Sequence, residues 1–185
     1  MSVRRRGFFM FLMKDDRYER KIPVIKELER THKRICYVCL SDTASSVSEE
    51  LTTRGLDRKK FVFVDTLSSY YGKKGSEERC KYVSSPFATR EIIDTVLRMR
   101  GRCDVFVFDT ISELLVYHDT SSVLRFTHDV ITKDIGKIVY MVPERDSVPQ
   151  RDVERLINDL VMFADKTTKL NDNGEVNAQE NNDSG

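Results

Sequence analysis

Five short stretches rich in Val, Ile, Phe and Tyr recur along the chain, and each is apolar almost throughout. They span residues 8–13, 35–40, 61–64, 105–108 and 138–142. Strands covered by helices on both faces have this near-continuous hydrophobicity, whereas half-exposed strands alternate between apolar and polar residues. The pattern therefore predicts five buried strands, and a weaker sixth strand is expected at residues 167–170.

Amphipathic segments with helical spacing separate these strands. Ile22, Ile25 and Leu28 share one helical face before the second strand. Ser46-Val47-Ser48-Glu49 fits a capping box, and Gly55 stands where a left-handed residue would end that short helix. Further apolar stripes mark three more helices, around Ile93, Val96 and Leu97, around Val123, Leu124, Thr127, Val130 and Ile131, and around Val153, Leu156, Ile157, Leu160 and Val161.

Alternating strands and helices require right-handed crossover connections, which produce a mostly parallel sheet with helices on both faces. The expected fold class is a three-layer α/β/α domain with five to six strands, formed by residues 1–170. Residues 68–84, which include Tyr70-Tyr71-Gly72-Lys73-Lys74-Gly75, are expected to form an exposed loop. Residues 171–185 are almost entirely polar, so they are expected to form a disordered tail.

Composition narrows the possible partners. The 185 residues include 31 Lys and Arg and 30 Asp and Glu, a net charge of +1. No field of the whole chain attracts nucleic acid or an anionic membrane, and only a local patch could do so. The apolar run at residues 7–13 is far shorter than the roughly 20 residues of a membrane span. The chain is therefore expected to be soluble and cytoplasmic, with no membrane partner.

The four cysteines include the pair Cys36-x-x-Cys39, a spacing found in zinc and redox sites. This pair falls within a predicted strand, where residues three apart face opposite sides of the sheet. No second C-x-x-C motif or histidine pair is present to complete a tetrahedral site. Buried, reduced thiols are the expected state.

Polar residues follow the predicted strands, at the edge where parallel sheets bind ligands. They are Lys14, Asp15 and Asp16 after the first strand, Ser41 and Asp42 after the second, Asp65 and Thr66 after the third, Asp109, Thr110 and Ser112 after the fourth, and Glu144 and Arg145 after the fifth.

The segment Asp104-Val-Phe-Val-Phe-Asp109-Thr-Ile-Ser-Glu-Leu-Leu115 resembles the Walker B strand of the RecA/KaiC-like ATPases. Arg54-Gly55-Leu56-Asp57, leading into residues 61–65, is similar to another segment of that family. The resemblance spans residues 7–170 and implies that Asp109 is a magnesium ligand and Asp42 a remnant of the water-activating position. It also implies side-by-side packing of such domains, with ATP at their junctions, and an archaeal source.

The chain departs from this family at the phosphate-binding loop. The family's first strand leads into G-x-x-x-x-G-K-[ST], in which backbone N–H groups surround the phosphates. The corresponding segment here, Lys14 to Pro23, contains no glycine and carries Asp15 and Asp16. Ser41 also replaces an expected glutamate. The candidate cofactor-binding residues are Lys14, Arg17, Arg20, Lys21, Thr110 and Ser112, but they cannot replace the missing backbone cradle.

The resulting first hypothesis is a non-catalytic RecA/KaiC-like domain, with Asp42 and Asp109 as vestigial catalytic residues. It would act as a regulatory or scaffolding module on an active ATPase of that family or on another copy of itself. It would have no cofactor of its own, and ATP with Mg²⁺ would bind only in a shared site. On this hypothesis Asp109 caps the loop that follows its strand and does not bind a metal.

Three alternatives remain open. The first is a weak ATPase subunit with a shared nucleotide site. The second is a receiver-like signalling domain with Asp65 as phosphoacceptor and Thr110 as switch residue, although no lysine precedes Pro143 as that class would require. The third is binding of single-stranded nucleic acid by the 68–84 segment, through Tyr70, Tyr71, Lys73, Lys74, Arg79 and Lys81.

Overall fold

The sheet is the centre of the molecule. The computed structural model describes residues 7–73, 75, 77–144, 148–171, 176 and 177. Within them, eight strands form one sheet in the order β4-β3-β2-β5-β6-β1-β7-β8, parallel throughout except for the antiparallel pair β7 and β8. The strands are β1 (Gly7–Met13), β2 (Ile35–Cys39), β3 (Phe61–Asp65), β4 (Cys80–Tyr82), β5 (Val105–Asp109), β6 (Lys137–Pro143), β7 (Lys166–Leu170) and β8 (Val176–Asn177).

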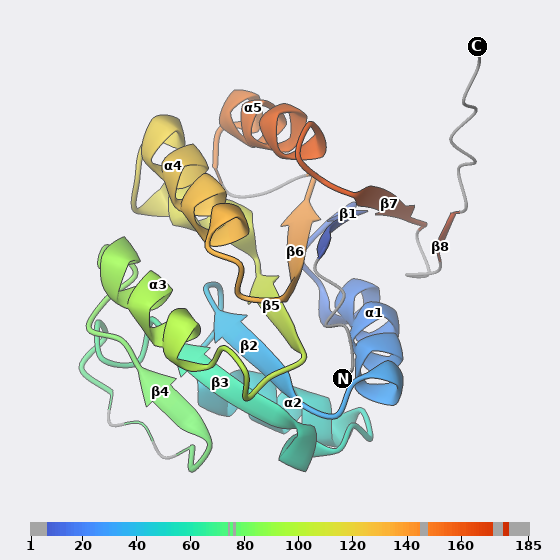
Figure 1. Ribbon diagram of the computed structural model, residues 1–185, viewed down its shortest axis with the longest axis vertical. Helices are drawn as coiled ribbons and strands as arrows, with labels where there is room; N and C mark the ends of the chain where they lie inside the picture. The colour runs from blue at the N-terminus through green and yellow to red at the C-terminus, as the bar shows by residue number, and fades with distance from the viewer. Residues whose placement is uncertain (1–6, 74, 76, 145–147, 172–175, 178–185) are drawn as a thin grey trace.

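Helices cover both faces of the sheet, as the alternating pattern predicts (Figure 1). On one face lie α1 (Tyr18–Thr31) and α2 (Ala44–Thr53), and on the other lie α3 (Thr89–Arg98), α4 (Thr120–Thr132) and α5 (Gln150–Val161). Two short 3₁₀ helices, η1 (Arg58–Lys60) and η2 (Ile111–Val116), precede β3 and follow β5. The three-layer α/β/α class predicted from the sequence is confirmed.

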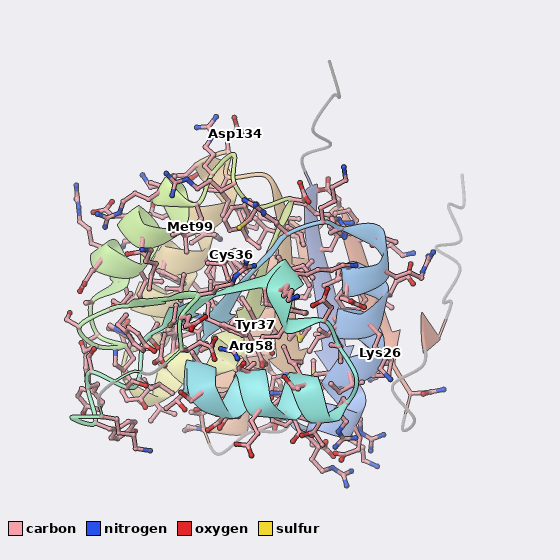
Figure 2. All side chains as sticks on the ribbon, turned by 90° about the horizontal axis from the view of Figure 1, so that it is seen from below. Lys26, Cys36, Tyr37, Arg58, Met99 and Asp134 are labelled. Atoms are coloured by element: carbon pink, nitrogen blue, oxygen red, sulfur yellow. The ribbon has the colours of Figure 1, made fainter. Side chains whose placement is uncertain are left out.

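The strands divide the core into two halves because successive side chains of a strand point to opposite faces. Cys36 packs in the half covered by α3, α4 and α5, whereas Tyr37 and Cys39 pack in the half covered by α1 and α2. Figure 2 shows Cys36 on the same side as Met99 and Tyr37 on the side of α2. The two thiols of the Cys36-x-x-Cys39 pair therefore diverge, as predicted.

All five predicted strands and the weaker sixth strand are present, but β4 and β8 were not predicted. β4 is a three-residue edge strand, Cys-Lys-Tyr, inside the segment that was expected to be an exposed loop. In that segment Glu77 and Val83 are buried. β8 lies in the expected tail and has only two residues. The rest of that tail, residues 172–175 and 178–185, lies outside the described residues.

The start of α2 differs from the predicted capping box. The N-cap is Thr43, whose Oγ1 accepts a hydrogen bond from the Ser46 amide at 3.4 Å. Because threonine caps as serine does, the sequence offered two nearby starts and the helix begins at the earlier one. Gly55 has a φ of +81°, the left-handed conformation expected after this helix.

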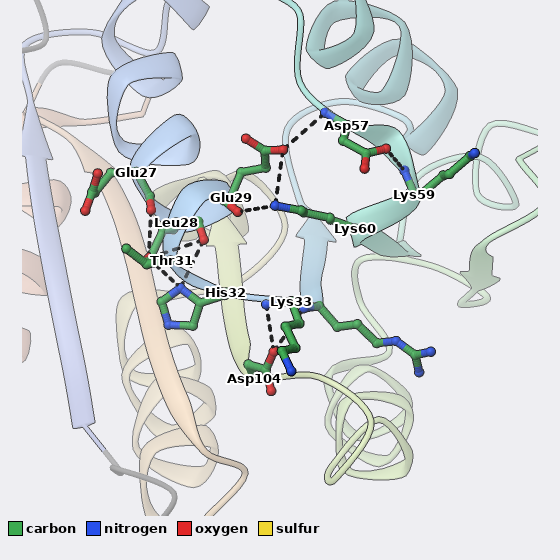
Figure 3. Close-up of polar contacts among 11 residues, drawn as sticks. Glu27, Leu28, Glu29, Thr31, His32, Lys33, Asp57, Lys59, Lys60 and Asp104 are labelled. Carbon is green, nitrogen blue, oxygen red and sulfur yellow. Dashed lines mark hydrogen bonds and ion pairs between the residues drawn. The ribbon is translucent and has the colours of Figure 1, made fainter.

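Polar contacts fix the connections at the amino edge of the sheet (Figure 3). One carboxylate oxygen of Asp104 accepts hydrogen bonds from the backbone amides of Lys33 and Arg34, both at 3.0 Å, just before β2. Nearby, Lys60 Nζ donates to the carbonyl of Glu29 at 2.7 Å. The first contact ties the start of β2 to the start of β5, and the second ties α1 to η1 just before β3.

None of the described helices combines the length and the apolar character that a membrane span requires.

Candidate functional site

The carboxyl ends of β2, β3 and β5 lie at the same level. Cys39, the last residue of β2, pairs in register with both Asp65 of β3 and Asp109 of β5. The Glu144 amide, after β6, donates to the Met13 carbonyl at the end of β1 at 2.7 Å. The polar residues predicted to follow the strands therefore share one edge, except Arg145, which lies outside the described residues.

Lys21 and Asp109 form a buried ion pair at this edge. Lys21, from the first turns of α1, has a side chain with no exposed surface, and Asp109 is 1% exposed. The ammonium lies 3.1 and 3.2 Å from the two carboxylate oxygens of Asp109 and 2.7 Å from Asp16 Oδ1. An ammonium has three donors, so its hydrogen-bonding capacity is used within the chain.

Tyrosine rings complete the surroundings of the pair. The Tyr37 hydroxyl donates to Asp109 Oδ2, and the Tyr18 ring lies 4.7 Å from the Lys21 ammonium. Burial alone would lower the pKa of Lys21, but the carboxylates of Asp109 and Asp16 outweigh it and raise that pKa above its usual value. Burial, followed by the charge of Asp109, raises the pKa of Tyr37. The cluster is thus a positive lysine and a neutral tyrosine facing carboxylates.

Asp42 lies beside this cluster and takes part in it through Tyr18. The Tyr18 hydroxyl donates to Asp42 Oδ2 at 3.2 Å. Burial, with the charges of Asp42 and Asp109, raises the pKa of Tyr18. The two candidate catalytic carboxylates, Asp42 and Asp109, are therefore joined through Tyr18 and Lys21. The sequence alone did not indicate the roles of Tyr18 and Tyr37, although Tyr18 lies three positions before Lys21, a spacing that places both on one helical face.

The connection from β1 to α1 is short, and its charged side chains bind one another. β1 ends at Met13 and α1 begins at Tyr18, so only residues 14–17 link them. Arg17 Nε and Nη2 donate to the two oxygens of Asp15 at 3.0 and 2.9 Å, and this hydrogen bonding lowers the pKa of Asp15. The buried Arg20 lies 3.6 Å from the same carboxylate. Lys14 is exposed at the end of β1.

The hydroxyl groups that follow β2 and β5 differ in whether they have a hydrogen-bond partner. Ser41 Oγ and Thr110 Oγ1 are buried without a hydrogen-bond partner among the described residues. Ser112, in η2, is buried and has a polar partner. A buried hydroxyl without a partner loses the hydrogen bonds that water would supply, so these two positions could accept an additional polar group.

Asp65, at the end of β3, is buried and anchors the backbone around it. It has no exposed surface, and it accepts hydrogen bonds from the amides of Ala44, Leu67 and Ser68 and from the Ser68 hydroxyl, at 2.7–2.9 Å. These bonds fix the start of α2 and the turn after β3. A phosphoacceptor carboxylate must be open to its phosphodonor, so this arrangement does not favour a receiver-like role.

The residues at this edge do not fit a phosphate-binding loop with Mg²⁺. The pattern G-x-x-x-x-G-K-[ST] can be placed on this segment with its lysine at Lys21. Asp15 and Arg20 then occupy the two glycine positions, and Ile22 replaces the Ser or Thr that would hold Mg²⁺. The carboxylate of Asp109 already accepts from Lys21 and Tyr37. A metal ion there would have to displace a buried ammonium.

No other metal centre is indicated within the described ranges, where no three His, Cys, Asp or Glu side chains come together. The four cysteines, Cys36, Cys39, Cys80 and Cys103, form no disulfide.

Comparison with known proteins supports the architecture. A scan against family models and a search of curated proteins found no match. Among solved structures, a KaiC-like protein from Pyrococcus horikoshii superposes with a TM-score of 0.56 at 12% identity, over 92% of this chain and 74% of that one.

A second similar structure is an ATPase from the type III secretion system of pathogenic bacteria. It has a TM-score of 0.58 at 11% identity. The alignment covers 90% of this chain but only 51% of the ATPase, so the chain spans about half of that protein. At such low identity the likeness concerns architecture alone, and the chain has a RecA/KaiC-like α/β fold.

Proposed function

We propose that this protein is a RecA/KaiC-like domain that does not hydrolyse ATP by itself and acts as a regulatory or scaffolding module through contact with another protein. The observation that carries this proposal is the buried contact of Lys21 with Asp109 and Asp16. A lysine that binds phosphate must offer its ammonium to the ligand, whereas this ammonium is bound by carboxylates of its own chain.

The charge balance at this edge supports the proposal. Asp15 and Asp16 occupy the connection where the family would place phosphates, and both are held by basic residues of the chain. A triphosphate would have to separate these ion pairs and would face the released carboxylates. Each hydrogen bond to a charged group contributes about 1.5–3 kcal/mol, so losing several would reduce nucleotide affinity by orders of magnitude.

The connection between β1 and α1 also opposes a phosphate cradle. With only residues 14–17 between the two elements, and no glycine among them, the backbone cannot adopt the series of left-handed and right-handed residues that points amides at an anion. The Arg17 amide is in fact directed at Asp15, 3.3 Å away. A carboxylate of the chain thus takes a position that a phosphate oxygen would need.

Isothermal titration of the pure protein with Mg-ATP tests the proposal. We expect no heat of binding and no thermal stabilisation at submillimolar nucleotide. Lys21→Met and Lys26→Ala form a matched pair, because Lys26 is exposed on the same helix. A micromolar isotherm that Lys21→Met abolishes and Lys26→Ala preserves would show that Lys21 does bind nucleotide, and the proposal would then be abandoned.

A second candidate function is a nucleotide-binding subunit whose site is completed by a neighbour. The hydroxyls of Ser41 and Thr110, which have no hydrogen-bond partner among the described residues, favour it, because they lie at the same edge as the lysine that matches the family pattern. ATP and Mg²⁺ would then bind only at a junction with an active ATPase. Phosphate release by a mixture with a KaiC-like ATPase, above the sum of the separate rates and lost in Asp109→Asn, would support this candidate. Rates that simply add would count against it.

A further inference from the structure

Four aromatic rings from three separate loops form an exposed cluster, which we call the aromatic platform: Tyr70, Tyr71, Phe87 and Tyr117. Tyr70 lies at the centre, with ring centroids 5.1 Å from Tyr71, 5.7 Å from Phe87 and 6.0 Å from Tyr117. Phe87 and Tyr117 are 5.3 Å apart. Tyr70, Tyr71 and Phe87 keep 45%, 57% and 49% of their surface exposed. Such a concentration of exposed aromatic surface is unusual on an isolated protein.

Hydrogen bonds hold the loops of the platform in place. The turn that carries Tyr70 and Tyr71 is fixed by the hydrogen bonds of Leu67 and Ser68 to the buried Asp65. The hydroxyls of Tyr71 and Tyr117 are 3.2 Å apart, which joins the loop after β3 to the end of η2. Rings that are ordered before binding lose little conformational entropy on contact, so they are well suited to anchor a partner.

A cleft between α3 and α4 adjoins the platform. It encloses about 270 Å³, enough for one or two side chains. His118 belongs to both features, because it lines the cleft and its ring lies 5.6 Å from that of Phe87. Five charged residues line the cleft: Arg90, Arg125, Lys133, Asp94 and Asp129. None of them forms an ion pair with any described side chain.

We infer that the aromatic platform and the α3–α4 cleft together bind a segment of a different protein that lays apolar side chains on the rings and directs carboxylates at Arg90 and Arg125. This inference rests on the proposed function, because it names the surface through which the domain would contact its partner. Tyrosine, phenylalanine and arginine are the residue types enriched in the centres of protein interfaces. The three basic side chains outnumber the two acidic ones, which favours an acidic segment.

The same charges disfavour nucleic acid as the occupant. A phosphate backbone carries a charge at every nucleotide, so part of it would face Asp94 and Asp129, whereas a peptide can place its few carboxylates at Arg90 and Arg125 alone. The basic residues of the 68–84 segment are also divided, because Arg79 and Lys81 line a separate cleft with Arg34 and Cys103, away from the tyrosines. Arg79 and Lys81 therefore do not join the tyrosines in the mixed aromatic and basic stripe that the sequence suggested, and Lys74 lies outside the described residues.

Selection from a random peptide display library against the full chain tests the inference. We expect enriched peptides to combine aromatic or aliphatic residues with Asp or Glu. Their binding should weaken at least about tenfold in Tyr70→Ala and in Arg125→Glu and remain unchanged in Met162→Ala, an exposed apolar residue at the end of α5. Circular dichroism and thermal unfolding establish that each variant is folded. Failure to enrich any peptide, or peptides that bind all three variants equally, would overturn the inference.

Two further measurements address the other occupants. Fluorescence anisotropy with a labelled oligothymidylate should show no binding, and binding lost in Tyr70→Ala would assign the platform to nucleic acid instead. Sedimentation velocity should show a monomer, and a dimer abolished by Tyr70→Ala would assign it to self-association. The Mg-ATP titration is read separately, since the platform variants leave Lys21 untouched. Nucleotide binding would remove the proposed function and leave the peptide result standing.

Discussion

The ammonium of Lys21 lies 3.1 and 3.2 Å from the two carboxylate oxygens of Asp109, although the residues are separated by 88 positions. Lys21 comes from the start of α1 and Asp109 from the end of β5, so the pair joins a helix to a strand that is not its sequence neighbour. Because both side chains are buried, neither can exchange its partner for water, and this gives the pair measurable consequences for stability.

The Lys21–Asp109 pair should behave as a coupled unit. Lys21→Met and Asp109→Leu should each lower the free energy of unfolding by about 3–5 kcal/mol, because each leaves a buried charge without its main partner. The double variant should lose clearly less than the sum. Urea denaturation measures all three, with Lys26→Ala as the exposed control, expected within about 0.5 kcal/mol of wild type. Strictly additive losses would show that the two residues are not coupled.

Asp65 should be essential for stability. Asp65→Ala should lower the free energy of unfolding by at least about 3 kcal/mol, because it leaves several buried amide donors without an acceptor. Asp57→Ala is the matched control: Asp57 caps η1 by accepting from the Lys59 amide at 3.0 Å, but it is exposed and should cost only about 1 kcal/mol. Equal losses in the two variants would contradict the anchoring role given to Asp65.

Alkaline pH should destabilise the fold through its buried tyrosines. Tyrosine in an unfolded chain has a pKa of about 10. In the folded protein, burial raises the pKa of Tyr18, Tyr37 and Tyr140. Their contribution to stability is therefore complete below pH 10 and is lost as the pH rises towards the folded pKa values.

Absorbance titration at the tyrosinate band checks this expectation. Fewer than the seven tyrosines of the chain should ionise in the native protein near pH 10, and the remainder should ionise together with unfolding. Tyr37→Phe should remove one tyrosine from the late group and none from the early group. If all seven tyrosines ionised near pH 10 while the circular dichroism spectrum stayed native, the assignment of buried tyrosines would be wrong.

The thiols should react in a defined order. The hydrogen bond with Cys36 lowers the pKa of Cys103, whereas burial raises the pKa of Cys80 to about 12. Both line the same cleft, where Cys103 is 6% exposed and Cys80 more exposed, so the larger thiolate fraction of Cys103 should let alkylation near neutral pH reach it before Cys80. Cys36 and Cys39, 0% and 1% exposed on opposite faces of the sheet and outside this cleft, should react only after unfolding.

Peptide mapping by mass spectrometry after brief exposure to iodoacetamide identifies the modified residue. In Cys103→Ser, overall labelling should slow, since the faster of the two cleft thiols is gone. Modification of Cys80 ahead of Cys103 in the native protein would contradict the prediction.

The sequence predicted the sheet well because its central strands are buried on both faces. A strand such as β5, Val-Phe-Val-Phe-Asp, has to be apolar throughout, and this leaves an unambiguous pattern. β4 left no such pattern, because it is a short edge strand whose side chains are partly exposed. Its existence depends on pairing with β3, a long-range interaction that local sequence does not encode.

The sequence predicted one part of the site, the edge of the sheet at which its polar residues lie. The polar residues that follow the strands could be placed at one edge, because parallel strands end on the same side of a sheet. The sequence also marked Lys21 and Asp109, but as separate candidates for phosphate and metal. Their direct contact, and the participation of Tyr37, depends on how α1 crosses the sheet, which fixes distances between residues far apart in the chain.

The strand order has a consequence for how the protein is made. β1 precedes every other described strand in the chain, yet it is flanked by β6 and β7, and its Phe8 amide is bonded to Asp165, 157 positions later. β1 therefore cannot acquire both of its neighbours until the chain has been synthesised through β7. In the meantime a strongly apolar segment, Phe-Phe-Met-Phe-Leu-Met, lacks both neighbours and is open to wrong pairing. Folding of this chain during translation should consequently leave β1 without its neighbours for longer than any other described strand.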